Sequence, residues 1–234
     1  MTEPRERRLL IAASSLADAE FAVDMAQPIL EWAAASPAAL FVEVEFVRFA
    51  TGPVHGIVTA GGAVQPLPPA ELARRMARRD AREIERRLAA LAAGAGPAVA
   101  CQMAAGDLVS TACAAILDED ILLLGRRPVV RRRGDVLFLG GPGSPDAPAR
   151  ALAELLARLS SASLIEVPLD AFRDGAGLER LVAQGRASVI VVDAGAGSDV
   201  DAADLRRLFA AARSPVAVVG ASRIGAALPP EQAG

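Results

Sequence analysis

Residue types that commonly carry chemistry are scarce in this chain. It has one histidine, His55, and two cysteines, Cys101 and Cys113, whose spacing fits neither a metal site nor a disulfide framework. Every basic residue is arginine, which excludes chemistry that needs a lysine, such as Schiff-base formation or a P-loop. We find no Ser–His–Asp set, no activated cysteine and no paired carboxylates. The sequence therefore predicts a protein that is not an enzyme.

One glycine segment could bind an anion through its backbone. Gly140-Gly141-Pro142-Gly143-Ser144 follows a predicted strand and precedes a predicted helix, and helix N-termini bind phosphates. Glu166 ends the next predicted strand, as a ribose-binding acid does in a dinucleotide fold. However, Asp146 stands where the third glycine is needed, and Pro142 and Pro145 lack N–H donors. The pattern therefore argues against dinucleotide binding.

A second glycine segment lies further along the chain, around Gly195 and Gly197. It is rich in carboxylates, which would repel a phosphate by about 1–4 kcal/mol each at a few ångströms. The carboxylates belong to Asp193, Asp199, Asp201 and Asp204. We interpret Asp199 and Asp201 as helix N-caps; the alternative is a Mg²⁺ site.

Two groups of arginines could contact anions. The first flanks the middle of the chain and comprises Arg126, Arg127, Arg131, Arg132 and Arg133. We interpret it as an exposed connector; the alternative is a site for an anion or an acidic partner, since guanidinium groups suit phosphates and carboxylates. The second group is the seven arginines of residues 74–87, which alternate with acids in a predicted helix. That alternation favours a solvated face over a nucleic-acid surface.

Apolar runs alternate with helical patterns along the whole chain. Predicted strands lie at 9–13, 39–44, 98–103 and 120–125, and then at 135–140, 163–167, 188–192 and 215–219. Predicted helices connect them, at 15–32, 68–93, 107–117, 145–159, 178–184 and 201–212. Similar strand openings recur at Leu9 and Val136, 127 residues apart. The sequence predicts an α/β fold of two tandem Rossmann-like parallel-sheet units, 1–134 and 135–234, the second shorter.

Local signals refine this outline. Ser15 and Asp18 form a capping box at the start of the first helix, and Pro28 should bend or divide that helix. Residues 48–69 are rich in glycine and proline and predict an irregular excursion. Residues after Gly220 are expected to form a tail.

This order of elements resembles a tandem universal stress protein. The resemblance rests on Phe21–Ala26, Arg150-Ala151-Leu152, Gly106-Asp107, Ile121–Gly125 and Ser214–Val219. It implies a Rossmann-like fold and a role in stress response. The ATP-binding members of that family have an acidic residue after the first strand and a G-x2-G-x9-G-[ST] motif after the fourth strand.

The chain departs from the ATP-binding pattern in both halves. Ser14 stands at the acidic position of the first half, and Gly141 or Pro142 at that of the second. Pro128 replaces the second glycine of the phosphate motif after Gly125. The resemblance therefore implies a vestigial nucleotide site, with no ATP as cofactor, at Ser14, Gly106, Gly125, Gly140, Gly141, Gly143, Gly195 and Gly197. The predicted function is a non-catalytic regulatory or protein-interaction module. The alternative is a nucleotide- or anion-binding protein that uses the second-half glycine loops and the junction arginines.

Composition limits the partners. Aromatic residues make up 3% of the chain, with no tyrosine, and the net charge is −3, which argues against nucleic acid. No apolar stretch approaches the length of about 18 residues needed to span a membrane, so we expect a cytoplasmic protein. Residues 215–219 are expected at or near a sheet edge. Such an edge predicts a homodimer through this strand, an intramolecular pairing with a stub at Val129-Val130, or an unidentified protein partner.

Overall fold

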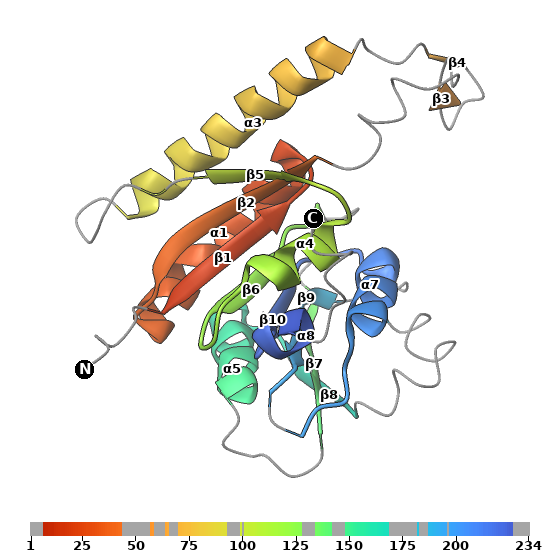
Figure 1. Ribbon diagram of the computed structural model, residues 1–234. Coiled ribbons are helices and arrows are strands. Elements are labelled where there is room, and N and C mark those ends of the chain that lie inside the picture. Colours follow the sequence, from red (N-terminus) through yellow and green to blue (C-terminus); the bar gives the residue numbers. More distant parts are fainter. Residues whose placement is uncertain are drawn as a thin grey trace, which may run out of the picture.

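The computed structural model describes residues 7–43, 57–58, 64–65, 70–92, 99, 101–127, 134–141, 148–168, 182, 187–195 and 197–226. An eight-stranded, mostly parallel sheet lies between two layers of helices, which confirms the predicted α/β fold (Figure 1). Several predicted features lie outside the described residues: Gly143, Arg131 to Arg133, the Val129-Val130 stub, His55 and most of the helix predicted at 178–184.

The first half contributes four parallel strands to the sheet. Its elements are β1 (Arg8–Ala13), α1 (Leu16–Ala33), β2 (Ser36–Glu43), β3 (Ile57–Val58), β4 (Val64–Gln65), α3 (Ala70–Leu91), β5 (Cys101–Ala105), α4 (Leu108–Ala115) and β6 (Ile121–Leu124). The excursion predicted at 48–69 contains β3 and β4, which form a separate two-stranded antiparallel sheet. Pro28 does not divide α1, which runs unbroken through it.

The second half contributes the other four strands. Its elements are β7 (Asp135–Gly140), α5 (Pro148–Ser160), β8 (Leu164–Pro168), β9 (Ala187–Asp193), α7 (Ala202–Ala211), β10 (Val216–Val219) and α8 (Ser222–Ala226). The expectation of a tail after Gly220 is wrong for its first residues, because α8 follows directly and buries Ile224. This short helix packs tightly on α4: a Cβ at Gly225 would lie 1.9 Å from the Cys113 carbonyl oxygen.

The strand order is β5-β2-β1-β6-β10-β9-β7-β8. All neighbours are parallel except β6 and β10, which pair antiparallel and join the two halves. The β1-α1-β2 and β7-α5-β8 units are laid out alike, but the third strand of the second half, β9, lies beside β7 and β10, whereas β5 lies at the outer edge. The two halves therefore share a β-α-β unit but add their third strand on different sides of it: β5 beside β2 at the outer edge, and β9 beside β7 toward the junction.

The expectation that residues 215–219 lie at a sheet edge is wrong. β10 pairs with β6 on one side, where Val216 faces Leu124, and with β9 on the other. Val216, Ala217 and Val218 are fully buried. A homodimer formed by adding a strand to this edge loses its structural basis, while self-association through another surface stays a prediction.

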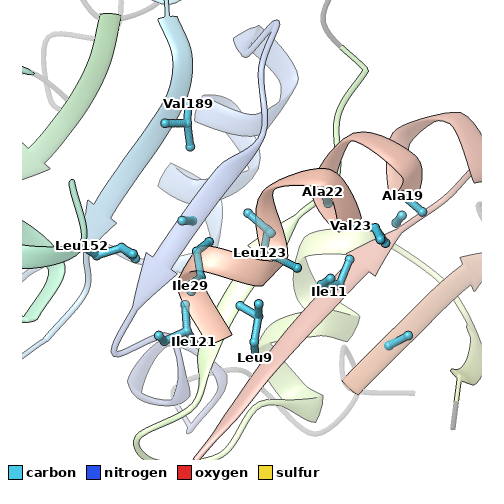
Figure 2. Packing of buried hydrophobic residues seen from close by; sticks show 14 of the residues in the cluster. Leu9, Ile11, Ala19, Ala22, Val23, Ile29, Ile121, Leu123, Leu152 and Val189 are labelled. Atoms are coloured by element: carbon cyan, nitrogen blue, oxygen red, sulfur yellow. The ribbon is translucent and has the colours of Figure 1, made fainter. Parts of the chain in front are cut away.

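Side chains alternate strictly between the two faces of the sheet. Odd-numbered residues of β1 and β6 pack on the side covered by α1, α3 and α5. Figure 2 shows two of them, Ile11 and Leu123, beneath α1. Even-numbered residues, such as Leu10 and Leu124, pack under α4, α7 and α8. Because both faces are covered, the middle residues of the central strands are apolar on both sides, as in parallel strands buried between two helix layers.

One buried carboxylate fixes the start of two central strands. Asp120 is 4% exposed and accepts hydrogen bonds from the backbone N–H groups of Arg8 (3.0 Å) and Leu117 (3.0 Å). Its Oδ2 also lies 2.6 Å from Nη2 of Arg8. The interaction joins the beginnings of β1 and β6 and the connection from α4.

We predict that Asp120→Ala lowers the free energy of unfolding by about 3 kcal/mol, because it removes one partner of a largely buried ion pair. Chemical denaturation followed by circular dichroism measures this. Glu71→Ala is the control, since Glu71 forms a 3.9 Å pair with Arg75 in which both side chains are mostly exposed; it should leave stability unchanged. Equal effects of the two substitutions would contradict the anchoring role of Asp120.

Candidate functional site

The antiparallel junction sends the carboxyl ends of the two half-sheets in opposite directions. In parallel sheets, ligands bind at the carboxyl ends of the strands. Ser14, Gly106 and Gly125 follow β1, β5 and β6 at one end of the sheet, whereas the Gly140–Gly141 and Gly195–Gly197 loops follow β7 and β9 at the other. The structure therefore does not bring the glycine loops predicted from the two halves into one site.

At the first-half end, the loop after β6 passes directly against the start of α1. The Gly125 N–H donates to the Ala12 carbonyl at 2.8 Å, and a Cβ at Gly125 would lie 2.7 Å from the Asp18 carbonyl oxygen. Glycine is therefore required here by close approach of two backbones. Ser14 is half-buried between β1 and the helix cap.

The Asp18 carboxylate ties this loop to the helix. One oxygen accepts a hydrogen bond from the Arg127 N–H at 2.7 Å, and the other accepts from the Ser15 hydroxyl at 2.7 Å. Ser15 is the N-cap of α1, and its Oγ accepts from the Asp18 N–H at 3.2 Å. The predicted cap is confirmed, and a negative charge of the chain itself stands at the helix N-terminus where an anion would bind.

At the second-half end, the loop after β9 also makes its hydrogen bonds internally. The Gly195 N–H donates to Oδ1 of Asp193 at 2.9 Å, and the Ala194 N–H donates to the Val219 carbonyl at 2.8 Å. Gly220 has a φ of +81°, and a Cβ there would lie 2.8 Å from the Gly195 Cα. The loop is thus packed against the end of β10.

Two acidic residues form the cap of α7, and the expectation that Asp199 is also an N-cap is wrong, because the helix begins directly after Asp201. Asp201 is the N-cap and forms a full capping box with Asp204, which confirms the prediction for Asp201. Asp204 also pairs with Arg207. Across the described ranges, no three His, Cys, Asp or Glu side chains gather in a way that could hold a metal ion.

Gly140 and Gly141 differ in their surroundings. A Cβ at Gly140 would lie 2.4 Å from the Phe138 ring, so the ring occupies the space beside this glycine. Gly141 is exposed, and a Cβ there would have no neighbouring atom within 4 Å. Neither glycine contacts a polar side chain in any described hydrogen bond.

The junction arginines that the structure describes have different roles. The guanidinium of Arg126 lies 4.8 Å from the ring centroid of Phe209, and its Nη2 donates to the Ala210 carbonyl at 3.4 Å. It therefore reaches from the first half onto the last turn of α7, where a cation is favourable. The Arg127 side chain is exposed. Both residues lie at the opposite end of the sheet from the second-half glycine loops.

A second polar contact between the halves was not anticipated from the sequence. Asp107 caps α4 and accepts hydrogen bonds from the Ser110 N–H (2.8 Å) and hydroxyl (2.7 Å), and Arg206 of α7 donates to the same hydroxyl at 3.3 Å. From the sequence, only the D-x-x-S pattern of the helix cap, Asp107 to Ser110, could be recognised. The partner arginine is 96 residues away in the chain.

Both thiols are held in the protonated form. Burial raises the pKa of Cys113 to about 12, helped by the nearby Asp107 carboxylate and opposed by Arg206. Burial also raises the pKa of Cys101 to about 11, with a further contribution from Glu85. Neither environment activates a thiolate, which requires a lowered pKa.

Part of α3 borders a hollow in the described surface. Its volume is about 780 Å³, within the range of ligand sites, and its described lining is Leu16 of α1 with Arg75, Arg78, Arg79, Arg82 and Arg86. Asp80 and Glu83 also line it. The sequence interpretation of these arginines as a solvated face did not anticipate a hollow beside them.

Comparisons with known proteins give structural neighbours only. No protein-family model matches the chain, and no curated protein matches it. A universal stress protein from Archaeoglobus fulgidus DSM 4304 aligns at 12% identity and a TM-score of 0.44, covering 92% of this chain and 96% of that chain. A functionally unknown protein from Pseudomonas aeruginosa PAO1 aligns at 12% identity and a TM-score of 0.36, covering 94% and 95%. At these values, membership of the universal stress protein family stays a prediction.

No helix within the described residues is both long enough and apolar enough to cross a membrane.

We predict that both thiols of the native protein react with a disulfide reagent at pH 8 at least about 100-fold more slowly than a free cysteine, because their raised pKa values leave little thiolate. Single-cysteine variants, Cys101→Ser and Cys113→Ser, separate the two sites in a stopped-flow or spectrophotometric assay. Unfolding in guanidinium should restore the ordinary rate. A native Cys113 that reacts as fast as a free thiol would contradict the assigned environment.

Proposed function

We propose that this chain is a non-catalytic regulatory module of the stress-response type, which acts by binding another protein and does not bind ATP. The observation that carries the proposal lies at the carboxyl end of the first half-sheet. There the Asp18 carboxylate, at the start of α1, accepts a hydrogen bond from the Arg127 N–H. This is the place where a Rossmann-like unit would accept a phosphate.

Electrostatics supports the loss of phosphate binding at this end of the sheet. A phosphate about 4 Å from the Asp18 carboxylate would be repelled by about 1–4 kcal/mol. The Arg127 N–H, a donor that a phosphate would need, is already used by Asp18. Close approach of Gly125 to the Asp18 carbonyl leaves no room between the loop and the helix.

The carboxyl end of the second half-sheet also lacks free donors for a phosphate. The Gly195 N–H is already bonded to Asp193, and the first turn of α7 is closed by the Asp201–Asp204 capping box. Both arrangements put carboxylates of the chain where a phosphate would need free donors. We therefore extend the proposed loss of ATP binding to the second half.

A non-catalytic role is supported by how the described polar side chains are used. Asp107, Asp120 and Asp201 bond to backbone N–H groups at helix and strand ends. Ser110 of α4 is 3% exposed and accepts a hydrogen bond from Arg206 of α7, and Arg126 packs on Phe209. These contacts hold elements together, and the Ser15 and Ser110 hydroxyls, which donate to the carboxylates of Asp18 and Asp107, belong to helix caps.

We predict that ATP with Mg²⁺ binds more weakly than a Kd of about 1 mM, which corresponds to about −4 kcal/mol. Isothermal titration calorimetry of the full chain measures this. Titration with adenosine alone is the control, because it would detect a site for the base that does not depend on the phosphates. Micromolar binding of MgATP would overturn the proposed function and favour the nucleotide-binding alternative.

A further inference from the structure

The two ends of α3 have different environments. The C-terminal half packs on α1, where Arg87 bonds to Glu20 at 2.7 Å and to Glu83 at 3.0 Å, and Ile84 and Leu88 are buried. The N-terminal end extends past the strands of the sheet (Figure 1). This end carries most of the arginines of the helix.

The arginines of the projecting end have almost no carboxylate partners. Among the described residues, Arg78, Arg79 and Arg82 form no ion pair, and the pair between Arg75 and Glu71 is long and exposed at 3.9 Å. Arg75/Arg79 and Arg78/Arg82 are like charges four residues apart, an arrangement that destabilises a helix. In a chain of net charge −3, α3 has seven arginines against four acids. The molecule thus concentrates uncompensated positive charge here.

Apolar side chains accompany these arginines. Leu72 is 44% exposed and Met76 is 55% exposed, and they lie one turn apart on the projecting end. Their spacing to Arg79 and Glu83 puts all four residues on one side of the helix, next to the 780 Å³ hollow. Exposed methionine and arginine side by side are typical of protein–protein interfaces.

We propose that this surface docks an acidic, amphipathic helical segment of another protein. Apolar side chains of the segment would cover Leu72 and Met76, and its carboxylates would meet Arg75, Arg79 and Arg82 along the hollow, as in helix-in-groove recognition. The inference rests on the proposed function, since it names the kind of partner that the module binds.

Charge and shape favour this occupant over others. A phosphate chain would use the guanidinium groups but leave Leu72 and Met76 in water. A second copy that presented the same surface would bring arginines against arginines. An acidic amphipathic helix satisfies both the cationic row and the apolar pair.

The test uses a fluorescein-labelled peptide of about 18 residues, long enough at about 1.5 Å per residue to follow the exposed part of α3. Its leucines recur at helical spacing on one side and glutamates occupy the rest. Fluorescence anisotropy with the full chain should show saturable binding that weakens with salt, because exposed charges are screened. A scrambled peptide of the same composition should bind at least about tenfold more weakly, since its leucines no longer share a face.

Matched variants locate the site. Arg79→Gln/Arg82→Gln and Leu72→Ser/Met76→Ser should each weaken binding at least about tenfold. Arg74→Gln/Arg158→Gln removes the same charge at exposed positions outside the hollow and should change binding less than about twofold. Circular dichroism confirms that each variant is folded.

Four results would overturn the inference. If the peptide shows no saturable binding, the docking site does not exist. If the two arginine double variants lose peptide affinity equally, the peptide is attracted by charge alone and has no specific site. Tripolyphosphate or duplex DNA that competes better than unlabelled peptide identifies a phosphate site instead. Self-association of the parent chain that Leu72→Ser/Met76→Ser abolishes makes a second copy the occupant. MgATP binding would overturn the proposed function alone, whereas a failed peptide titration without ATP binding overturns only the docking site.

Discussion

The antiparallel pairing of β6 with β10 is the interaction on which the rest of the structure depends. It converts two short parallel half-sheets into one sheet and buries Val216, Ala217 and Val218 at its centre. It also reverses the second half relative to the first, so their carboxyl ends face opposite ways. The described glycine loops at the carboxyl ends of the two halves therefore do not meet, and each end of the sheet has to be considered alone.

The halves are held together by more than this ladder. Arg126 reaches from the end of β6 to Phe209 and the Ala210 carbonyl, and Arg206 reaches back to Ser110 of α4. α8 adds a tight contact with α4. These polar side chains are thus employed in assembling a continuous three-layer fold.

α3 illustrates how one helix can serve two purposes. Its buried residues recur at helical spacing, with Ala77, Ala81, Ile84 and Leu88 toward the sheet, and this stripe is enough to hold it. The opposite side is therefore free to carry charge. Arginines that are paired near α1 and unpaired at the projecting end divide the helix into an anchored part and an available part.

The sequence by itself determined the elements and their local caps. All eight strands of the main sheet were recognisable as short apolar runs, including the partly exposed outer strands β5 and β8. Ser15 and Asp201 cap helices through bonds to residues three positions away. It also showed that no catalytic constellation could be recognised in the chain. Residues 215–219 were misplaced at an edge because an apolar strand looks the same whether its neighbour is solvent, a second molecule or β6. Only the tertiary structure decided that pairing, the separation of the glycine loops, and the roles of Arg8, Arg126 and Arg206. Each of these depends on contacts between residues about a hundred positions apart, for which local patterns carry no information.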